Sequence, residues 1–122
     1  MTFLLMLTTA VSAFGQAEIK FAELTHNFGT FSEDNATQKT TFTFTNVGDA
    51  PLIINQATAS CGCTVPEYTK KPILPGKTGT ITVTYNGKYR FPGHFKKTIT
   101  VRTNGKVEMT RLYIEGNMLE KK

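Results

Sequence analysis

The chain has 122 residues, which is enough for one domain and too few for two. Its hydrophobic share of 39% is ordinary for a globular protein and excludes a wholly disordered chain. The net charge of +5 is spread along the sequence, and there is neither a basic helical pattern nor a glycine-rich phosphate loop, so no nucleic-acid binding is expected. The densest basic stretch, Lys88, Arg90, Lys96 and Lys97, fits a solvated strand-and-loop surface.

The N-terminus has the features of a secretory signal. Residues 3–14 are apolar or small, in a run that is too short to span a bilayer but matches the apolar core of an export signal. Ala13 and Gly15 supply small residues at the −3 and −1 positions of a cleavage site. We therefore expect a signal peptide over residues 1–15 and a single exported domain over residues 16–122, without a transmembrane segment in the mature chain.

Several stretches of the mature chain have the composition or the period-two alternation of β-strands. The alternation is clear in residues 39–45, where Thr40, Phe42 and Phe44 face one way and the intervening side chains the other. We expect strands over residues 18–24, 39–45, 52–60, 80–85, 95–102 and 109–117.

Turn residues separate these stretches. Asn46-Val47-Gly48-Asp49 follows one strand, and Pro75-Gly76 lies in the connection before another. Asn104-Gly105 is the strongest hairpin signal in the chain, because both residues tolerate the positive φ of a two-residue type I′ turn. Residues 120–122 are expected to form a frayed polar tail.

Strands that each have one apolar face require a second sheet to cover that face. No stretch of the mature chain has a convincing helical pattern. We therefore predict an all-β fold, an immunoglobulin-like β-sandwich of about seven antiparallel strands. The sequence contains no Trp, so the Cys…Trp…Cys arrangement of antibody domains is missing.

Cys61 and Cys63 are the only cysteines, and in an extended strand their side chains would share one face. An oxidising compartment favours a local disulfide between them, which would stabilise the fold by only about 1.6 kcal/mol for a three-residue loop. Two thiolates also suit Cu(I) or part of a zinc site, for which His26 is a further candidate ligand. The third alternative is that both are small apolar residues packed at one end of the sandwich.

No catalytic site is expected. A nucleophilic thiol needs a general base, and neither His26 nor His94 stands in a recognisable catalytic context. His26, in a His-Asn-Phe-Gly run, fits a turn or packing residue, and His94, after Pro92-Gly93, fits a loop. The chain is therefore expected to be no enzyme and to carry no cofactor.

Six short motifs lie within residues 23–116, the part of the chain over which a family resemblance extends. They are His26-x-Phe28-Gly29, Phe42-x-Phe44-Thr45-Asn46-x-Gly48, Pro51-Leu52-x-Ile54, Ser60-Cys61-Gly62-Cys63-Thr64, Pro72-Ile73-x-Pro75-Gly76 and Gly93-x-Phe95-x-Lys97. Together they resemble the bacterial family called domain of unknown function 1573. The resemblance implies a short secreted or periplasmic protein of a Bacteroidetes-type bacterium with an immunoglobulin-like fold, and it implies no activity. Asn27 departs from the acidic residue usual after the histidine, which weakens a metal or charge role for His26.

Two hypotheses for the function follow. The first is a non-enzymatic structural or protein-interaction module of the cell envelope, located in the periplasm or secreted by a Gram-negative bacterium, whose partner is another protein or an envelope component. The alternative is a thiol-based metal-binding protein of the copper type, or a redox protein, that uses Cys61 and Cys63. Replacing both cysteines by serine would abolish metal uptake or disulfide exchange only under the alternative.

Overall fold

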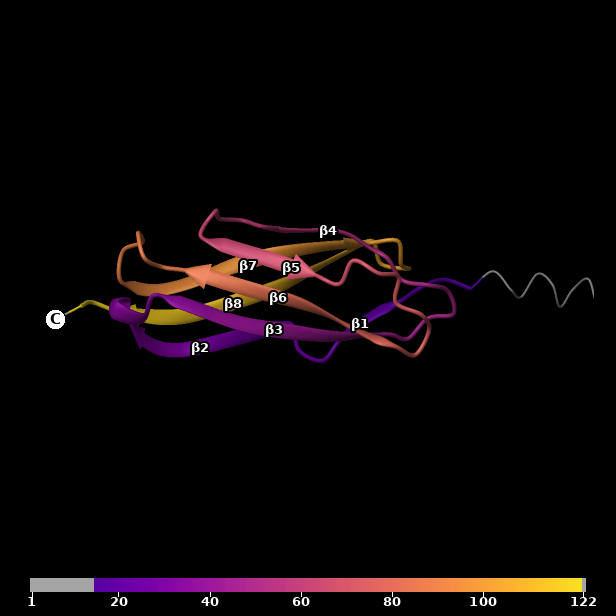
Figure 1. The fold of residues 1–122 in the computed structure, drawn as a ribbon, viewed down its shortest axis with the longest axis horizontal. Helices are drawn as coiled ribbons and strands as arrows, with labels where there is room; N and C mark the ends of the chain where they lie inside the picture. Colours follow the sequence, from indigo (N-terminus) through magenta and orange to yellow (C-terminus); the bar gives the residue numbers. More distant parts are fainter. Residues whose placement is uncertain (1–14, 122) are drawn as a thin grey trace, which may run out of the picture.

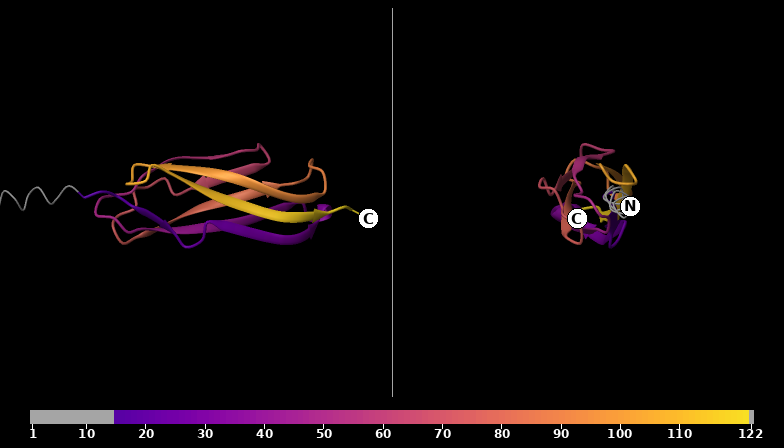
Figure 2. Two further views of the ribbon diagram at one scale, coloured as in Figure 1. Left: turned by 180° about the vertical axis from the view of Figure 1, so that it is seen from behind. Right: turned by 90° about the vertical axis from the view of Figure 1, so that its right-hand side faces the viewer.

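The computed structural model describes residues 15–121, which form two β-sheets packed face to face around one apolar core (Figure 1, Figure 2). The expected signal segment lies outside the described residues except for Gly15. The strands are β1 (Ile19–Phe21), β2 (Thr25–Ser32), β3 (Thr37–Asn46), β4 (Ile54–Ala59), β5 (Thr64–Tyr68), β6 (Thr78–Asn86), β7 (Gly93–Thr103) and β8 (Met109–Leu119), and one short 3₁₀ turn, η1 (Glu33–Asn35), precedes β3.

One sheet has the strand order β1-β3-β6-β5 and the other the order β2-β8-β7-β4. The predicted immunoglobulin-like β-sandwich is therefore confirmed. Two details of the prediction are corrected. Eight strands form among the described residues instead of about seven, and β2 runs parallel to β8 while every other neighbouring pair is antiparallel.

The first expected strand, residues 18–24, is shorter than predicted, because only Ile19–Phe21 form β1 and β2 begins at Thr25, after the expected range. β1 pairs antiparallel with the end of β3, and the chain then crosses to the other sheet, where β2 lies beside β8. The backbone N–H of Tyr113 donates to the carbonyl oxygen of Leu24 at 2.8 Å and fixes the crossing point. The His-Asn-Phe-Gly run is thus strand rather than turn, although Gly29 (φ 75°) marks a bulge within it.

Strand β5 was not expected from the sequence. Pro66 and Glu67 make residues 64–68 a poor strand by composition. β5 is an edge strand, and a proline without a backbone N–H is tolerated at the edge of a sheet. Pairing with β6, through Thr64↔Tyr85 and Pro66↔Val83, overrides the unfavourable local composition.

The core contains alternate residues of both sheets. In β3, Phe42 and Phe44 are buried while Thr41 and Thr43 are exposed, which confirms the predicted register of this strand. Further buried side chains come from the central strands of both sheets: Ile81, Val83, Tyr85, Ile99, Val101, Leu112 and Ile114. Burial of these side chains removes apolar area from water and is the main force that holds the two sheets together.

Asn46, expected to be a turn residue, is completely buried at the end of β3. Its Oδ1 accepts hydrogen bonds from the backbone N–H groups of Glu18 (3.2 Å) and Gly48 (2.9 Å). Its Nδ2 donates to the carbonyl oxygens of Ala50 (2.8 Å) and Ile73 (2.9 Å). One side chain thereby joins β1, the loop after β3 and the loop before β6.

Asn104-Gly105 lies in the connection of an antiparallel hairpin, β7–β8, as predicted, but the predicted two-residue type I′ turn is wrong. β7 ends at Thr103 and β8 begins at Met109, and neither Asn104 nor Gly105 has the positive φ that a type I′ turn requires. The Asn104 side chain instead accepts from the N–H of Ile53 (2.8 Å) and donates to the carbonyl oxygen of Pro51 (3.1 Å). These tertiary hydrogen bonds outweigh the local turn preference.

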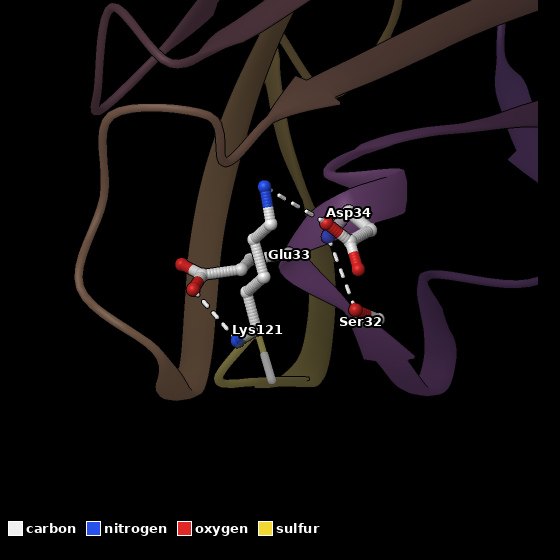
Figure 3. A network of polar contacts seen from close by, with 4 residues as sticks. All are labelled: Ser32, Glu33, Asp34 and Lys121. Carbon is white, nitrogen blue, oxygen red and sulfur yellow. Dashed lines mark hydrogen bonds and ion pairs between the residues drawn. The ribbon is translucent and has the colours of Figure 1, made fainter.

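The C-terminal tail is not wholly frayed, as Figure 3 shows. The backbone N–H of Lys121 donates to the carboxylate of Glu33 at 2.7 Å, and Nζ of Lys121 lies 3.6 Å from the carboxylate of Asp34. Ser32 begins η1 by accepting from the N–H of Asp34 at 3.1 Å. The two acidic residues of η1 therefore hold the described end of the chain.

Candidate functional site

The cysteine segment is the short loop that joins β4 to β5, two edge strands that belong to different sheets (Figure 1). The sulfur atoms of Cys61 and Cys63 are joined as a disulfide. The intervening Gly62 is exposed, and a Cβ added there would meet no other atom within 4 Å. The disulfide thus closes the tip of a surface loop.

Backbone hydrogen bonds hold this loop at both ends. Ser60 donates its N–H to the carbonyl oxygen of Thr98 on β7 at 3.0 Å. On the other side, the N–H of Asn86 donates to the carbonyl oxygen of Cys63 at 2.7 Å, and the N–H of Thr64 donates to that of Cys61 at 3.1 Å. The two sulfur atoms therefore have a fixed position relative to β6 and β7.

Arg90 contacts the disulfide from the β6–β7 loop. Its Nη2 donates to Sγ of Cys61 at 2.8 Å, across 29 positions of sequence. A second donor, the backbone N–H of Cys63, reaches the same sulfur at 3.2 Å. The sequence placed Arg90 in a solvated basic stretch and gave no sign of this contact, because only the fold brings the two loops together.

The loop that carries Arg90 also exposes two aromatic side chains. Tyr89 is 85% and Phe91 96% exposed, on either side of Arg90 in the sequence. The loop is nevertheless ordered by short hydrogen bonds, since the N–H of Arg90 donates to the carbonyl oxygen of Gly87 and that of Gly87 donates to the carbonyl oxygen of Ala36, each at 3.0 Å. In the sequence, neither aromatic residue can be distinguished from a residue of the hydrophobic core.

Tyr85, near the end of β6, connects the site to the core. Its ring is buried and stacks on Phe95 with the ring centroids 4.0 Å apart. Burial raises the pKa of the Tyr85 hydroxyl above its usual value of 10.0, and the positive charge of Arg90 lowers it in part. Arg90 thus affects both the disulfide and this buried phenol.

The structure does not bring the candidate ligand His26 to the cysteines. His26 is on β2 and the cysteine loop follows β4, and these are the two opposite edges of one sheet. Its ring packs edge-to-face on Phe28, with centroids 4.8 Å apart, and lines a cavity of about 170 Å³ beside β3. His94, expected in a loop, lies at the start of β7, where its Nε2 is 3.5 Å from the carboxylate of Glu115.

Among residues 15–121 no three His, Cys, Asp or Glu side chains are grouped closely enough to hold a metal ion. Within the same range no helix has the length and apolar character needed to cross a membrane. The candidate site consists of a disulfide in a surface loop, the Arg90 guanidinium that contacts it, and the two exposed aromatic rings that flank Arg90 in the sequence.

Solved structures with the same fold come from unrelated settings. A protein of unknown function from Porphyromonas gingivalis matches with a TM-score of 0.71 and 18% identity over 84% of this chain, which spans only 46% of that protein. The seventh PapD-like domain of human CEP192 matches with a TM-score of 0.69 and 9% identity, over 88% of this chain and 89% of that one.

A chaperone–tip adhesion subunit complex of Acinetobacter baumannii Csu pili also matches, with a TM-score of 0.57, 11% identity and coverage of 84% of this chain and 57% of that one. At these identities the likeness shows the fold alone. No protein of curated function matches the sequence. The family described as "protein of unknown function (DUF1573)" matches residues 19–118, so the chain belongs to this family.

Proposed function

We propose that this protein is an exported, non-enzymatic interaction module of the cell envelope that binds a protein partner through its aromatic loop, residues 87–92. Export is supported by the signal-like residues 1–15, which leave residues 16–122 as one mature domain in the periplasm or outside the cell of a Gram-negative bacterium. A chain with the same fold occurs in the complex between the Csu chaperone and a tip adhesion subunit. This is consistent with a protein partner and does not identify one.

The observation that carries the proposal is the exposure of Tyr89 and Phe91 on an ordered loop. Aromatic side chains dominate the binding energy of protein interfaces, and neighbouring apolar groups exposed to water often mark such an interface. Hydrogen bonds at Gly87, Lys88 and Arg90 restrict the backbone of the loop before binding, so less conformational entropy would be lost when a partner covers the two rings.

Affinity capture from an envelope extract tests the proposal. We expect the wild-type protein to retain a specific partner that Tyr89→Ser/Phe91→Ser does not retain, with at least about 30-fold weaker binding, as is typical of aromatic hot spots. Val107→Ser is the matched control, because Val107 is also exposed (58%) but lies in the β7–β8 loop. Equal capture by all three proteins, at several salt concentrations, would contradict the proposal.

A second candidate function is thiol chemistry at Cys61 and Cys63, either disulfide exchange or copper-type metal binding. The contact between Arg90 and Cys61 Sγ favours disulfide exchange, since a nearby guanidinium stabilises a thiolate. Because His26 is on the far edge of the sheet, metal binding would rely on the thiols of Cys61 and Cys63 without it, and both thiols would have to be in their reduced form. The variant Cys61→Ser/Cys63→Ser should lose disulfide exchange or copper uptake, and unchanged behaviour in both assays would contradict this candidate.

A further inference from the structure

We propose that Cys61 is the exchanging sulfur of a surface dithiol–disulfide pair, that Arg90 stabilises its thiolate, and that the reaction partner is a thiol or disulfide of another exported protein. This proposal deepens the second candidate function and rests on it. It assigns different roles to two cysteines that are equivalent in the sequence motif.

The hydrogen-bond donors around the two sulfur atoms are unequal. Arg90 Nη2 (2.8 Å) and the N–H of Cys63 (3.2 Å) both point at Cys61 Sγ. Cys63 Sγ has the hydroxyl of Thr64 as a neighbour, at the longer distance of 3.6 Å. Since charged donors form the stronger hydrogen bonds to an anion, a negative charge is better stabilised on Cys61 than on Cys63 in the reduced protein.

Access to the two sulfur atoms is unequal as well. Cys63 packs against the hydrophobic core, and its carbonyl oxygen is fixed by Asn86. Cys61 lies outside the core, and its contact with Arg90 is exposed to solvent. An incoming sulfur therefore meets Cys61 first, and Cys63 is placed to act as the resolving thiol.

Arg90 is held in place independently of the disulfide. Its N–H donates to the carbonyl oxygen of Gly87 at 3.0 Å, and the N–H of Lys88 donates to Oδ1 of Asn86, also at 3.0 Å. The same Asn86 anchors the cysteine loop through its backbone. These bonds hold the backbone of Arg90, so the guanidinium can still reach Cys61 when the disulfide opens, which is a requirement for stabilising the thiolate.

The exchange balances as two successive substitutions at sulfur. A thiolate of a partner dithiol attacks Cys61 Sγ, the Cys61–Cys63 bond breaks, and Cys63 leaves with the electron pair and takes a proton from water. The second partner thiolate then attacks the partner sulfur of the mixed disulfide, and Cys61 leaves as a thiolate beside Arg90. The partner is oxidised to a disulfide and this protein is reduced by two electrons; the reverse sequence oxidises this protein.

Single-cysteine variants of the full protein test the assignment. Alkylation by iodoacetamide is measured against pH in Cys63→Ser, which retains Cys61, and in Cys61→Ser, which retains Cys63. We expect Cys61 to reach half of its maximal rate at a lower pH than Cys63. Adding Arg90→Gln to Cys63→Ser should slow alkylation at neutral pH about three- to fivefold, the size of an exposed charge contact.

Lys88→Gln in the same background is the control, since it removes a positive charge from the same loop without touching Cys61. It should slow alkylation by less than Arg90→Gln does. Equal pH midpoints for the two cysteines, or an unchanged rate in Arg90→Gln, would overturn the proposal.

A second assay separates failure of this assignment from failure of the candidate function. The reduced full protein is incubated with glutathione disulfide, quenched with acid and examined by peptide mass. We expect re-formation of the Cys61–Cys63 bond, and in Cys63→Ser a mixed disulfide on Cys61, both slower with Arg90→Gln. Exchange that is insensitive to Arg90 would overturn only the roles assigned to Cys61 and Arg90, and no exchange in the wild type would overturn thiol redox as a function.

Discussion

At the residue scale, individual polar side chains at one end of the sandwich fix the loops. Asn46 is completely buried and uses all four of its hydrogen-bonding positions on backbone groups that belong to three separate segments. Asn104 has a comparable role at the surface, where it bonds to Pro51 and Ile53. Tyr85 connects the core to the candidate site through its stacking on Phe95 and its proximity to Arg90.

Replacing Asn46 by Ala should destabilise the fold by about 3 kcal/mol or more. The change removes the side-chain partner of two N–H groups and of the carbonyl oxygen of Ala50 at partly buried positions, and each such loss costs about 1–3 kcal/mol before relaxation, whereas the carbonyl oxygen of Ile73 still accepts from Leu52. Asn55→Ala, at an exposed position of β4, should cost less than about 0.5 kcal/mol. Urea unfolding of both variants checks this, and similar midpoints for the two would show that Asn46 is not a structural hub.

Tyr85 should make the stability depend on alkaline pH. Because burial raises the pKa of Tyr85 above that of the unfolded chain, its contribution is complete below pH 10 and is lost as pH rises through the folded value. Unfolding free energy should therefore fall above about pH 10, and Tyr85→Phe should reduce this fall. Tyr89→Phe, at an exposed position, is the control, and equal pH profiles for the two variants would contradict the explanation.

At the element scale, each strand combines an alternating sequence with a position in the sheet that suits its irregularities. β3 is central and alternates without interruption, whereas the edge strands carry the exceptions. β2 contains the bulge at Gly29, β1 has only three residues, and β5 contains Pro66. Short strands, bulges and prolines at edges reduce edge-to-edge association between copies of a β protein.

The register of β3 can be tested by alanine substitutions. Phe42→Ala and Phe44→Ala should each cost about 3–5 kcal/mol, because both rings are buried in the core. Thr43→Ala, on the exposed face between them, should change stability by no more than about 0.5 kcal/mol. Thermal or denaturant unfolding measures the stability of all three variants. Small and equal losses of stability would show that the register assigned to β3 is wrong.

At the scale of the whole molecule, one end of the sandwich gathers the chemically distinctive features. The cysteine loop, the aromatic loop and η1 lie at this end, and hydrogen bonds from Asn86 to Cys63 and from Gly87 to Ala36 connect them. The opposite end is closed by Asn46 and Asn104. The two loops with the disulfide and the exposed aromatic rings are thus at one end, and the buried asparagine network is at the other.

The disulfide is expected to contribute little to the stability of this architecture. It closes a loop of three residues, for which chain entropy gives about 1.6 kcal/mol, against a core that extends over both sheets. We expect Cys61→Ser/Cys63→Ser to remain folded, with its unfolding free energy lowered by no more than about this amount. A variant that fails to fold, as judged by circular dichroism, would show that the disulfide is a structural staple after all.

The sequence by itself determined the fold class, the central strands and the family. Period-two alternation in β3, β6 and β8 reflects burial of one sheet face, and a buried face is a local property of the sequence. The motif Ser60–Thr64 likewise identified the unusual chemical feature without any structure. The motif left a disulfide, a metal site and packed thiols open as alternatives, with the disulfide favoured by export to an oxidising compartment.

Only the tertiary structure decided how the pieces meet. The crossing of the chain from β1 to β2, the parallel pairing of β2 with β8 and the strand character of residues 64–68 all depend on neighbours that are distant in sequence. The same is true of the Asn104 loop and of the Arg90–Cys61 contact, which joins positions 29 residues apart. Local propensities are small, about 1 kcal/mol or less per residue, so a few long-range hydrogen bonds and buried contacts outweigh them.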